Sequence, residues 1–251
     1  MGLVVSTLGV GMDYNEALMT EIATQGQGRF YHVQTPDEIV PHLTGELGEA
    51  ADLAARDVKI HIHLPKGAAL IPLSASYTCE IADGVATVSI GNIPADLEVE
   101  IPLRLTLFSG KANQRLEVEG DITYRTPSDS TLKAHLNQVT VRFVKPNLFE
   151  TQTGVVKPVA ARVAKQMYAR QVLGFSRAFT RRNEAEIRAI EEERARFNKY
   201  VELLDKDLKK EMTQQIDSDF QSIRSASPMA KNVVSNAYMT SRNMRNRKDK
   251  K

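Results

Sequence analysis

The first stretch whose residue types could do chemistry is Gly9-Val-Gly11, which precedes a predicted helix. Glycines before a helix can cradle a phosphate, because the backbone N–H groups of a helix N-terminus attract anions. A dinucleotide-binding fingerprint, however, needs a third glycine and an acid about twenty residues further on. Asp13 stands at the start of the helix instead, and its carboxylate would repel a phosphate. The carboxyl edge is where α/β sheets bind their ligands, so we predict that Asp13 and Tyr14 border a partner surface in a complete domain.

A second candidate is the pair His61 and His63, which lie on one face of a predicted strand because they are two residues apart. Two imidazoles at this spacing could hold one metal ion, but a zinc site needs further ligands, and no Cys or His is nearby in the sequence. Lys59 shares their face. We interpret the pair as part of a polar strand face, and we predict no metal ligand and no cofactor for this chain.

Basic side chains gather in the C-terminal part of the chain. Residues 157–251 carry 22 basic and 12 acidic side chains, whereas residues 1–156 carry 11 and 19. Such asymmetry indicates attraction between the two halves, or an anionic partner such as nucleic acid or a membrane surface. Many acids also follow the arginines, and few aromatic side chains are present for base stacking. We therefore expect a protein partner first, and nucleic acid or an anionic membrane surface as the alternative. The candidate anion-binding residues are Arg177, Arg181, Arg182, Arg245, Arg247 and Lys248.

No nucleophile and base stand together in a way that predicts catalysis, and we expect a non-enzymatic protein. Asp129, Ser130 and His135 are close in sequence, but the chemistry of a polar turn explains them. Cys79 is the single cysteine, so an internal disulfide framework is excluded. No apolar run reaches the roughly 18 residues of a transmembrane helix.

The elements that must position these residues begin with a strand, helix, strand, helix order over 6–11, 14–24, 29–33 and 36–47. Asp13 followed by Glu16 predicts a capping box for the first helix, and Thr35 followed by Glu38 predicts one for the second. A two-stranded parallel unit cannot cover both faces of its own sheet. We therefore predict that residues 1–55 are a partial α/β domain that lies against neighbours outside this chain.

The rest of the chain changes period twice, which predicts an α+β protein of several domains. Residues 56–147 alternate with a period of two and are divided by turn residues into six or seven short strands, which predicts an antiparallel β-sandwich. Asp83-Gly84 predicts a hairpin with a type I′ turn. Residues 155–241 have helical periodicity, and we expect residues 242–251 to be a disordered basic tail.

One long helix is predicted from Asn183, because apolar residues recur at spacings of three, four or seven. This stripe either packs on the sandwich or associates with a partner helix. Its members are Ile187, Ile190, Phe197, Val201, Leu204, Leu208, Met212, Ile216, Phe220 and Ile223.

Residues 5–48 resemble the last third of a bacterial von Willebrand factor type A domain. The resemblance is carried by Ser6-Thr-Leu-Gly-Val-Gly11, Asp13-Tyr-Asn-Glu-Ala-Leu-Met19, Gly26-Gln-Gly-Arg-Phe-Tyr31 and Thr35-Pro-Asp-Glu-Ile39. A β-rich segment and a basic helical tail follow in many bacterial proteins of that type.

The resemblance implies a doubly wound, Rossmann-like fold that binds Mg²⁺ through an Asp-x-Ser-x-Ser motif with a later Thr and Asp, and that grips a carboxylate of a protein partner. Asp-x-Ser-x-Ser does not occur in this sequence. The motif would belong to the first strand of the domain, upstream of Met1, so we assign no metal ligand and expect Mg²⁺ only in a complete domain. We predict that the chain is the C-terminal part of such a protein and serves protein–protein interaction.

Overall fold

The computed structural model describes residues 4–145, 156–242 and 244–246. Its first unit consists of β1 (Val5–Val10), α1 (Glu16–Gln25), β2 (Gln27–Val33), the 3₁₀ turn η1 (Pro36–Glu38) and α2 (Ile39–Ala51). β1 and β2 pair in parallel, as the sequence predicts. The predicted cap of α1 is wrong, because Asn15 is the N-cap and accepts a bond from the Leu18 N–H. At η1 the Thr35 hydroxyl donates to Glu38 but caps no backbone N–H.

An antiparallel sheet follows after a single connecting residue. Its strand order is β10-β9-β3-β6-β5, and β11 also pairs with β9. A second layer is formed by the β4–β8 ribbon, and apolar residues of both layers meet in one core that includes Val58, Leu70 and Val88. The strands are β3 (Leu53–His63), β4 (Ala69–Pro72), β5 (Thr78–Ala82), β6 (Val85–Pro94), β7 (Leu97–Val99), β8 (Leu103–Thr106), β9 (Arg115–Arg125), β10 (Thr131–His135) and β11 (Val139–Arg142).

The predicted hairpin at Asp83-Gly84 is confirmed. Both residues have positive φ, 51° and 76°, and Ala82 pairs with Val85 across the turn. Positive φ at both central positions defines the type I′ turn, which matches the right-handed twist of the strands it joins.

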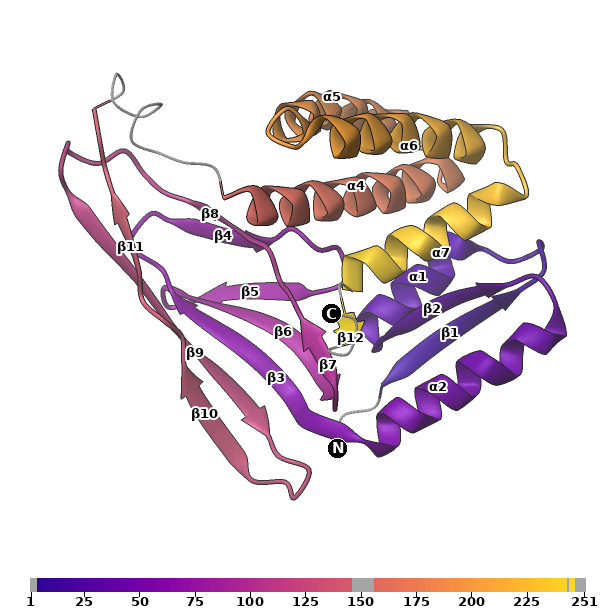
Figure 1. The fold of residues 1–251 in the computed structure, drawn as a ribbon, viewed down its shortest axis with the longest axis horizontal. Helices are drawn as coiled ribbons and strands as arrows, with labels where there is room; N and C mark the ends of the chain where they lie inside the picture. Colours follow the sequence, from indigo (N-terminus) through magenta and orange to yellow (C-terminus); the bar gives the residue numbers. More distant parts are fainter. Residues whose placement is uncertain (1–3, 146–155, 243, 247–251) are drawn as a thin grey trace.

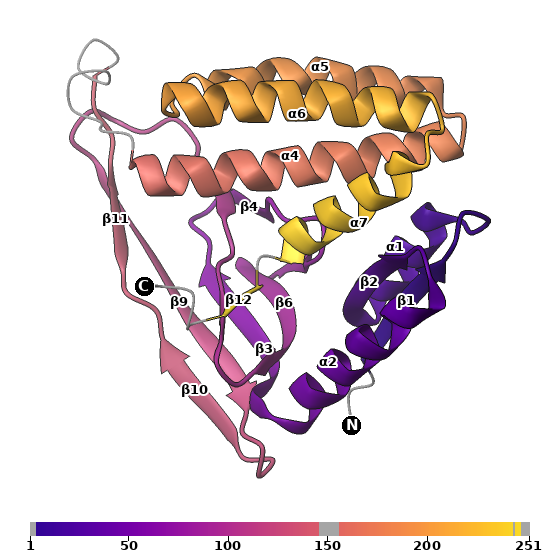
Figure 2. The same cartoon turned by 45° about the vertical axis from the view of Figure 1, so that its right-hand side comes forward.

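The C-terminal region is a helical layer of α4 (Lys157–Thr180), α5 (Glu184–Val201), α6 (Lys206–Arg224) and α7 (Met229–Arg242). The prediction of one continuous helix from Asn183 to Ile223 is wrong, because the chain turns between α5 and α6. The two helices lie side by side along α4 (Figures 1 and 2). Each helix presents its own part of the apolar stripe to the same core. The spacing of apolar residues in the sequence therefore does not reveal that the helix is interrupted. The stripe is thus buried within the chain, with Phe197 and Ile216 fully covered.

α1 and α7 together cover one face of the β1–β2 pair, and α7 packs against β2 on one side and α4 on the other (Figure 1). The Tyr238 hydroxyl donates to the Gly28 carbonyl oxygen over 3.0 Å, and its ring meets Phe30 edge to face at 6.2 Å. A Cβ on Gly28 would lie 2.2 Å from the Val5 carbonyl oxygen, so the close approach of β1 and β2 requires glycine here. The prediction that the unit's neighbours lie outside the chain is therefore wrong for this face.

The end of α7 also contacts the loop that joins β4 to β5. The Ser74 hydroxyl donates to the Ser241 carbonyl oxygen, and the Tyr77 hydroxyl donates to the Arg242 carbonyl oxygen, each over 2.6 Å. After it, β12 (Met244–Asn246) pairs with β7, so the predicted disorder from residue 242 is wrong for these positions. Arg247 and Lys248 lie outside the described residues.

Tyr238→Phe removes the hydroxyl that bonds Gly28 and should lower the free energy of unfolding by about 1 kcal/mol, because a buried carbonyl loses its partner. Urea unfolding measures this change. Tyr200→Phe is the matched control, since that side chain is 37% exposed. An equal effect of both substitutions would show that the Tyr238 bond does not hold α7 on the β1–β2 pair.

Candidate functional site

The carboxyl edge of the β1–β2 pair holds a small polar cluster around Tyr14. The Tyr14 hydroxyl lies 2.7 Å from His32 Nδ1, and Lys231 Nζ of α7 lies 4.0 Å from the Tyr14 ring centroid. A Cβ on Gly9 would lie 2.3 Å from the ring, so Tyr14 rests directly on the backbone of β1. Tyr14 is therefore held by the fold, whereas Asp13 beside it is exposed.

Protonation in this cluster follows from burial. Burial, and then the nearby Glu16, raise the pKa of Tyr14 well above its usual range. Burial, and then Lys231, lower the pKa of His32. At neutral pH the tyrosine therefore donates and the neutral histidine accepts at Nδ1. Lys231 is satisfied by the Tyr14 carbonyl oxygen at 2.7 Å and by Glu16 at 3.0 Å, so the cluster joins α7 to the β1–α1 loop.

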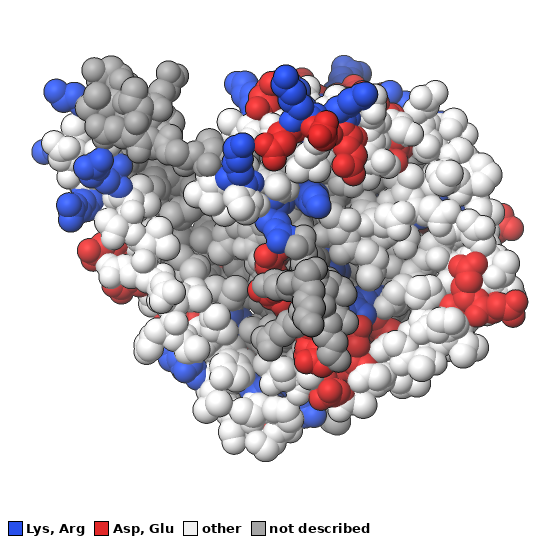
Figure 3. Space-filling model, in the orientation of Figure 1, with Lys and Arg blue, Asp and Glu red and all other residues white. Residues whose placement is uncertain are grey.

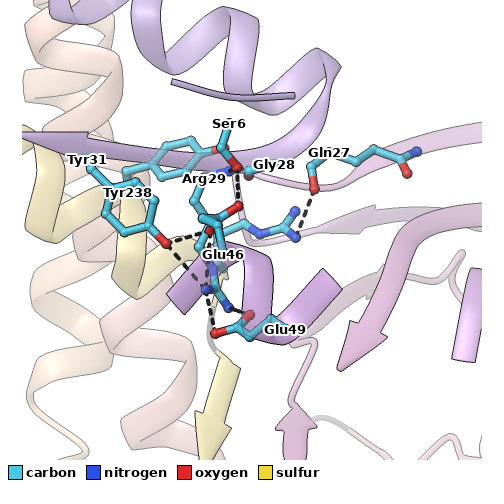
Figure 4. Close-up of polar contacts among 9 residues, drawn as sticks. Ser6, Gln27, Gly28, Arg29, Tyr31, Glu46, Glu49 and Tyr238 are labelled. Carbon is cyan, nitrogen blue, oxygen red and sulfur yellow. Dashed lines mark hydrogen bonds and ion pairs between the residues drawn. The ribbon is translucent and has the colours of Figure 1, made fainter. Parts of the chain in front are cut away.

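A second polar cluster fixes α2 against the other face of the β1–β2 pair (Figure 4). Arg29 Nη2 lies 2.6 Å from Glu49, and the hydroxyls of Tyr31 and Ser6 both donate to Glu46 over 2.6 Å. Burial disfavours the charge of Arg29, but the bonds to Glu49 and Tyr31 raise its pKa above the usual range. Burial, and then the bond to Glu46, raise the pKa of Tyr31 to about 12. α2 is thus held by its polar side.

The apolar side of α2 consequently faces away from the chain. Val40, Leu43 and Leu47 are 66%, 53% and 72% exposed, and their spacing places them on one side of the helix. β1 pairs with β2 along one edge, and no other described strand pairs with it. Our sequence analysis missed this surface, although the spacing of the three apolar residues was visible in the sequence.

The predicted anion-binding residues do not form one surface among the described parts of the chain. Arg177 lies 3.5 Å from Glu21 of α1, and Arg181 and Arg182 stand exposed at the turn after α4. Only the backbone of Arg245 is described, in β12, far from that turn (Figures 1 and 2). Figure 3 shows acidic and basic side chains mixed over the helical layer.

The histidines singled out in the sequence have protein partners. His61 lies within hydrogen-bond distance of Thr87 and Thr123, at 3.1 and 2.8 Å, and His63 lies 3.6 Å from Asp121. Within residues 4–145, 156–242 and 244–246, no three or more His, Cys, Asp or Glu residues are grouped so that they could hold a metal ion. No helix in the described ranges is long and apolar enough to cross a membrane.

Comparison with known proteins supports the fold. A solved structure of a von Willebrand factor type A protein from Catenulispora acidiphila matches 96% of this chain, with a TM-score of 0.59 at 12% sequence identity. The chain has a von Willebrand type A-like fold. The match extends well beyond residues 5–48, so the β-rich and helical parts belong to the similarity as well.

No family model matches the sequence of this chain. The uncharacterized protein YfbK of Escherichia coli K12 is 39% identical over 62 residues, which is 24% of this chain and 11% of that protein. The chain also spans only 59% of the length of the structural neighbour. What YfbK or the Catenulispora protein does as a whole is therefore not assigned to this chain.

The buried His32 should make the protein less stable in acid. In the unfolded chain the pKa of a histidine is about 6.5, and in the folded protein the pKa of His32 lies below that value. As the pH falls, the unfolded state therefore binds a proton before the folded state does. The free energy of unfolding should therefore decrease from about pH 7 to about pH 5, and His32→Gln should reduce that decrease. Urea titrations at the two pH values measure it. The exposed His63→Gln is the control, and an unchanged pH dependence in His32→Gln would contradict the assignment.

Proposed function

We propose that this chain is a non-enzymatic interaction or scaffold protein, namely the C-terminal part of a von Willebrand type A protein. Its partner surface consists of the open edge of β1 and the exposed apolar side of α2, defined by Val40, Leu43 and Leu47. The occupant is an α/β segment that adds a strand beside β1 and covers α2. The supporting observation is that α2 is fixed to the sheet by its polar side.

Physical cost supports this proposal. An exposed strand edge and an adjoining apolar stripe are liabilities that folded proteins normally cover. Burial of each of the three apolar side chains of α2 would contribute roughly 1.5–3 kcal/mol to the free energy of association. The added strand would satisfy the backbone N–H and carbonyl groups on the outer edge of β1. An α/β segment can supply both contributions, since its strand pairs with β1 and its apolar side chains cover α2.

The remainder of the chain acts as a rigid support in this proposal. α7 bonds the β1–β2 pair through Tyr238 and the β4–β5 loop through Ser241, so the β1–β2 pair is tied to the β-rich part of the chain. The metal-dependent grip on a partner, which the resemblance implies for a complete domain, would be supplied by the added segment. Mg²⁺ is not required by the surface described here.

The proposal can be tested by replacing Leu43 with a photo-crosslinking amino acid in the full chain, expressed in the organism from which the protein comes. The expected product joins position 43 to a peptide from an α/β segment that carries Asp-x-Ser-x-Ser. Leu43→Asp should weaken that association by about 10-fold or more, because a buried leucine contributes about 1.5–3 kcal/mol.

The matched control is the same crosslinker at Leu132, an exposed leucine of β10 that lies outside the proposed surface. Equal labelling from the two positions, or products from position 43 that all lack such a segment, would overturn the proposed function.

A further inference from the structure

A cavity of about 900 Å³ lies where the first unit, the antiparallel sheet and α7 meet. Its wall includes four arginines from four different elements: Arg29 of β2, Arg56 of β3, Arg125 of β9 and Arg242 of α7. The volume falls in the range of small-molecule sites, about 300–1,000 Å³. This cavity is separate from the exposed side of α2.

Arg242 is the group in the wall that most needs a partner. The residue is only 4% exposed, and its guanidinium stays charged at any ordinary pH. Nη2 donates to the Gln27 carbonyl oxygen over 3.1 Å, and the guanidinium lies 5.5 Å from the Tyr77 ring centroid. Nε and Nη1 are buried without a hydrogen-bond partner among the described residues. Buried charged donors left unsatisfied are costly, so an acceptor is expected there.

The carboxylates of the wall do not supply that acceptor. Glu46 and Glu49 are bound to Arg29, and Asp57 lies 3.6 Å from Lys59. The fourth, Asp129, is bound to Arg125 over 3.0 Å. Each acid of the wall is therefore engaged by another cation.

Two further arginines line the same cavity as Arg242. Arg56 and Arg125 are directly paired across β3 and β9, a placement that brings like charges together and is unfavourable without a shared anion. Arg125 Nε is buried and has no hydrogen-bond partner in the described chain. An anion between these side chains would relieve the repulsion and satisfy the donors.

We propose that this cavity binds a small anion through its phosphate or carboxylate oxygens, with Arg56, Arg125 and Arg242 as donors. Planar guanidinium groups bind such oxygens in pairs of parallel hydrogen bonds, which suits either chemistry. Because its donors come from β3, β9 and α7, the ligand would tighten the junction on which the first unit rests. The proposal is independent of the partner surface on α2.

Calorimetric titration of the full chain with pyrophosphate and with citrate, at constant ionic strength, tests the proposal. Saturable binding of either anion is expected, and the preferred anion identifies phosphate or carboxylate as the ligand group. Arg56→Gln should weaken binding by about 10-fold or more, as expected for lost charge-assisted hydrogen bonds. Arg242→Gln should have at least as large an effect.

Arg188→Gln is the matched control, because that arginine is exposed on α5 and lies outside the cavity. Arg56 is partly exposed, so its substitution disturbs the fold less than that of the buried Arg242. Arg56→Gln therefore keeps the test valid if Arg242→Gln fails to fold. Absence of saturable binding, or equal affinity in wild type, Arg56→Gln and Arg188→Gln, would overturn the proposal.

Discussion

The structure depends on the contact between α7 and the parallel pair β1–β2. A two-stranded parallel sheet cannot cover its own faces, and α7 completes the cover that α1 begins on one of them, with Tyr238 against Gly28 and Phe30. The same helix ends against the loop between β4 and β5, where the hydroxyls of Ser74 and Tyr77 donate to the carbonyl oxygens of Ser241 and Arg242. Residues more than 200 positions apart are thereby joined, and the first unit acquires a fixed position that its own sequence does not provide.

The opposite face is held in a different way, and this difference carries the functional proposal. Arg29 and Tyr31 bind Glu46 and Glu49, so polar contacts hold α2 to the sheet. Its apolar side is left outward, beside a strand edge without a partner in the described chain. Apolar side chains on a helix normally turn toward a core. In our proposal, this reversed orientation reflects a partner segment that covers the apolar side of α2.

Local sequence signals were sufficient for much of the fold but not for its long-range contacts. Alternation and Asp83-Gly84 identified strands and a hairpin, because these depend on neighbouring residues. The turn at Glu202–Asp205 was missed, since both helices bury the same stripe and no glycine or proline marks the break. The docking of α7 and the burial of Arg242 arise from tertiary packing, which periodicity does not encode. The exposed side of α2 becomes evident only once its polar bonds to the sheet are known.

Native-state hydrogen exchange on the purified chain tests the central claim most directly. The account predicts slow exchange in β2, residues 27–33, because α7 covers it, and clearly faster exchange in α2, residues 39–51, which has no buried side chain. Comparable slow exchange in both segments would contradict it, since α2 would then already be covered without a partner. Fast exchange in both would contradict it as well, because α7 would not hold the parallel pair.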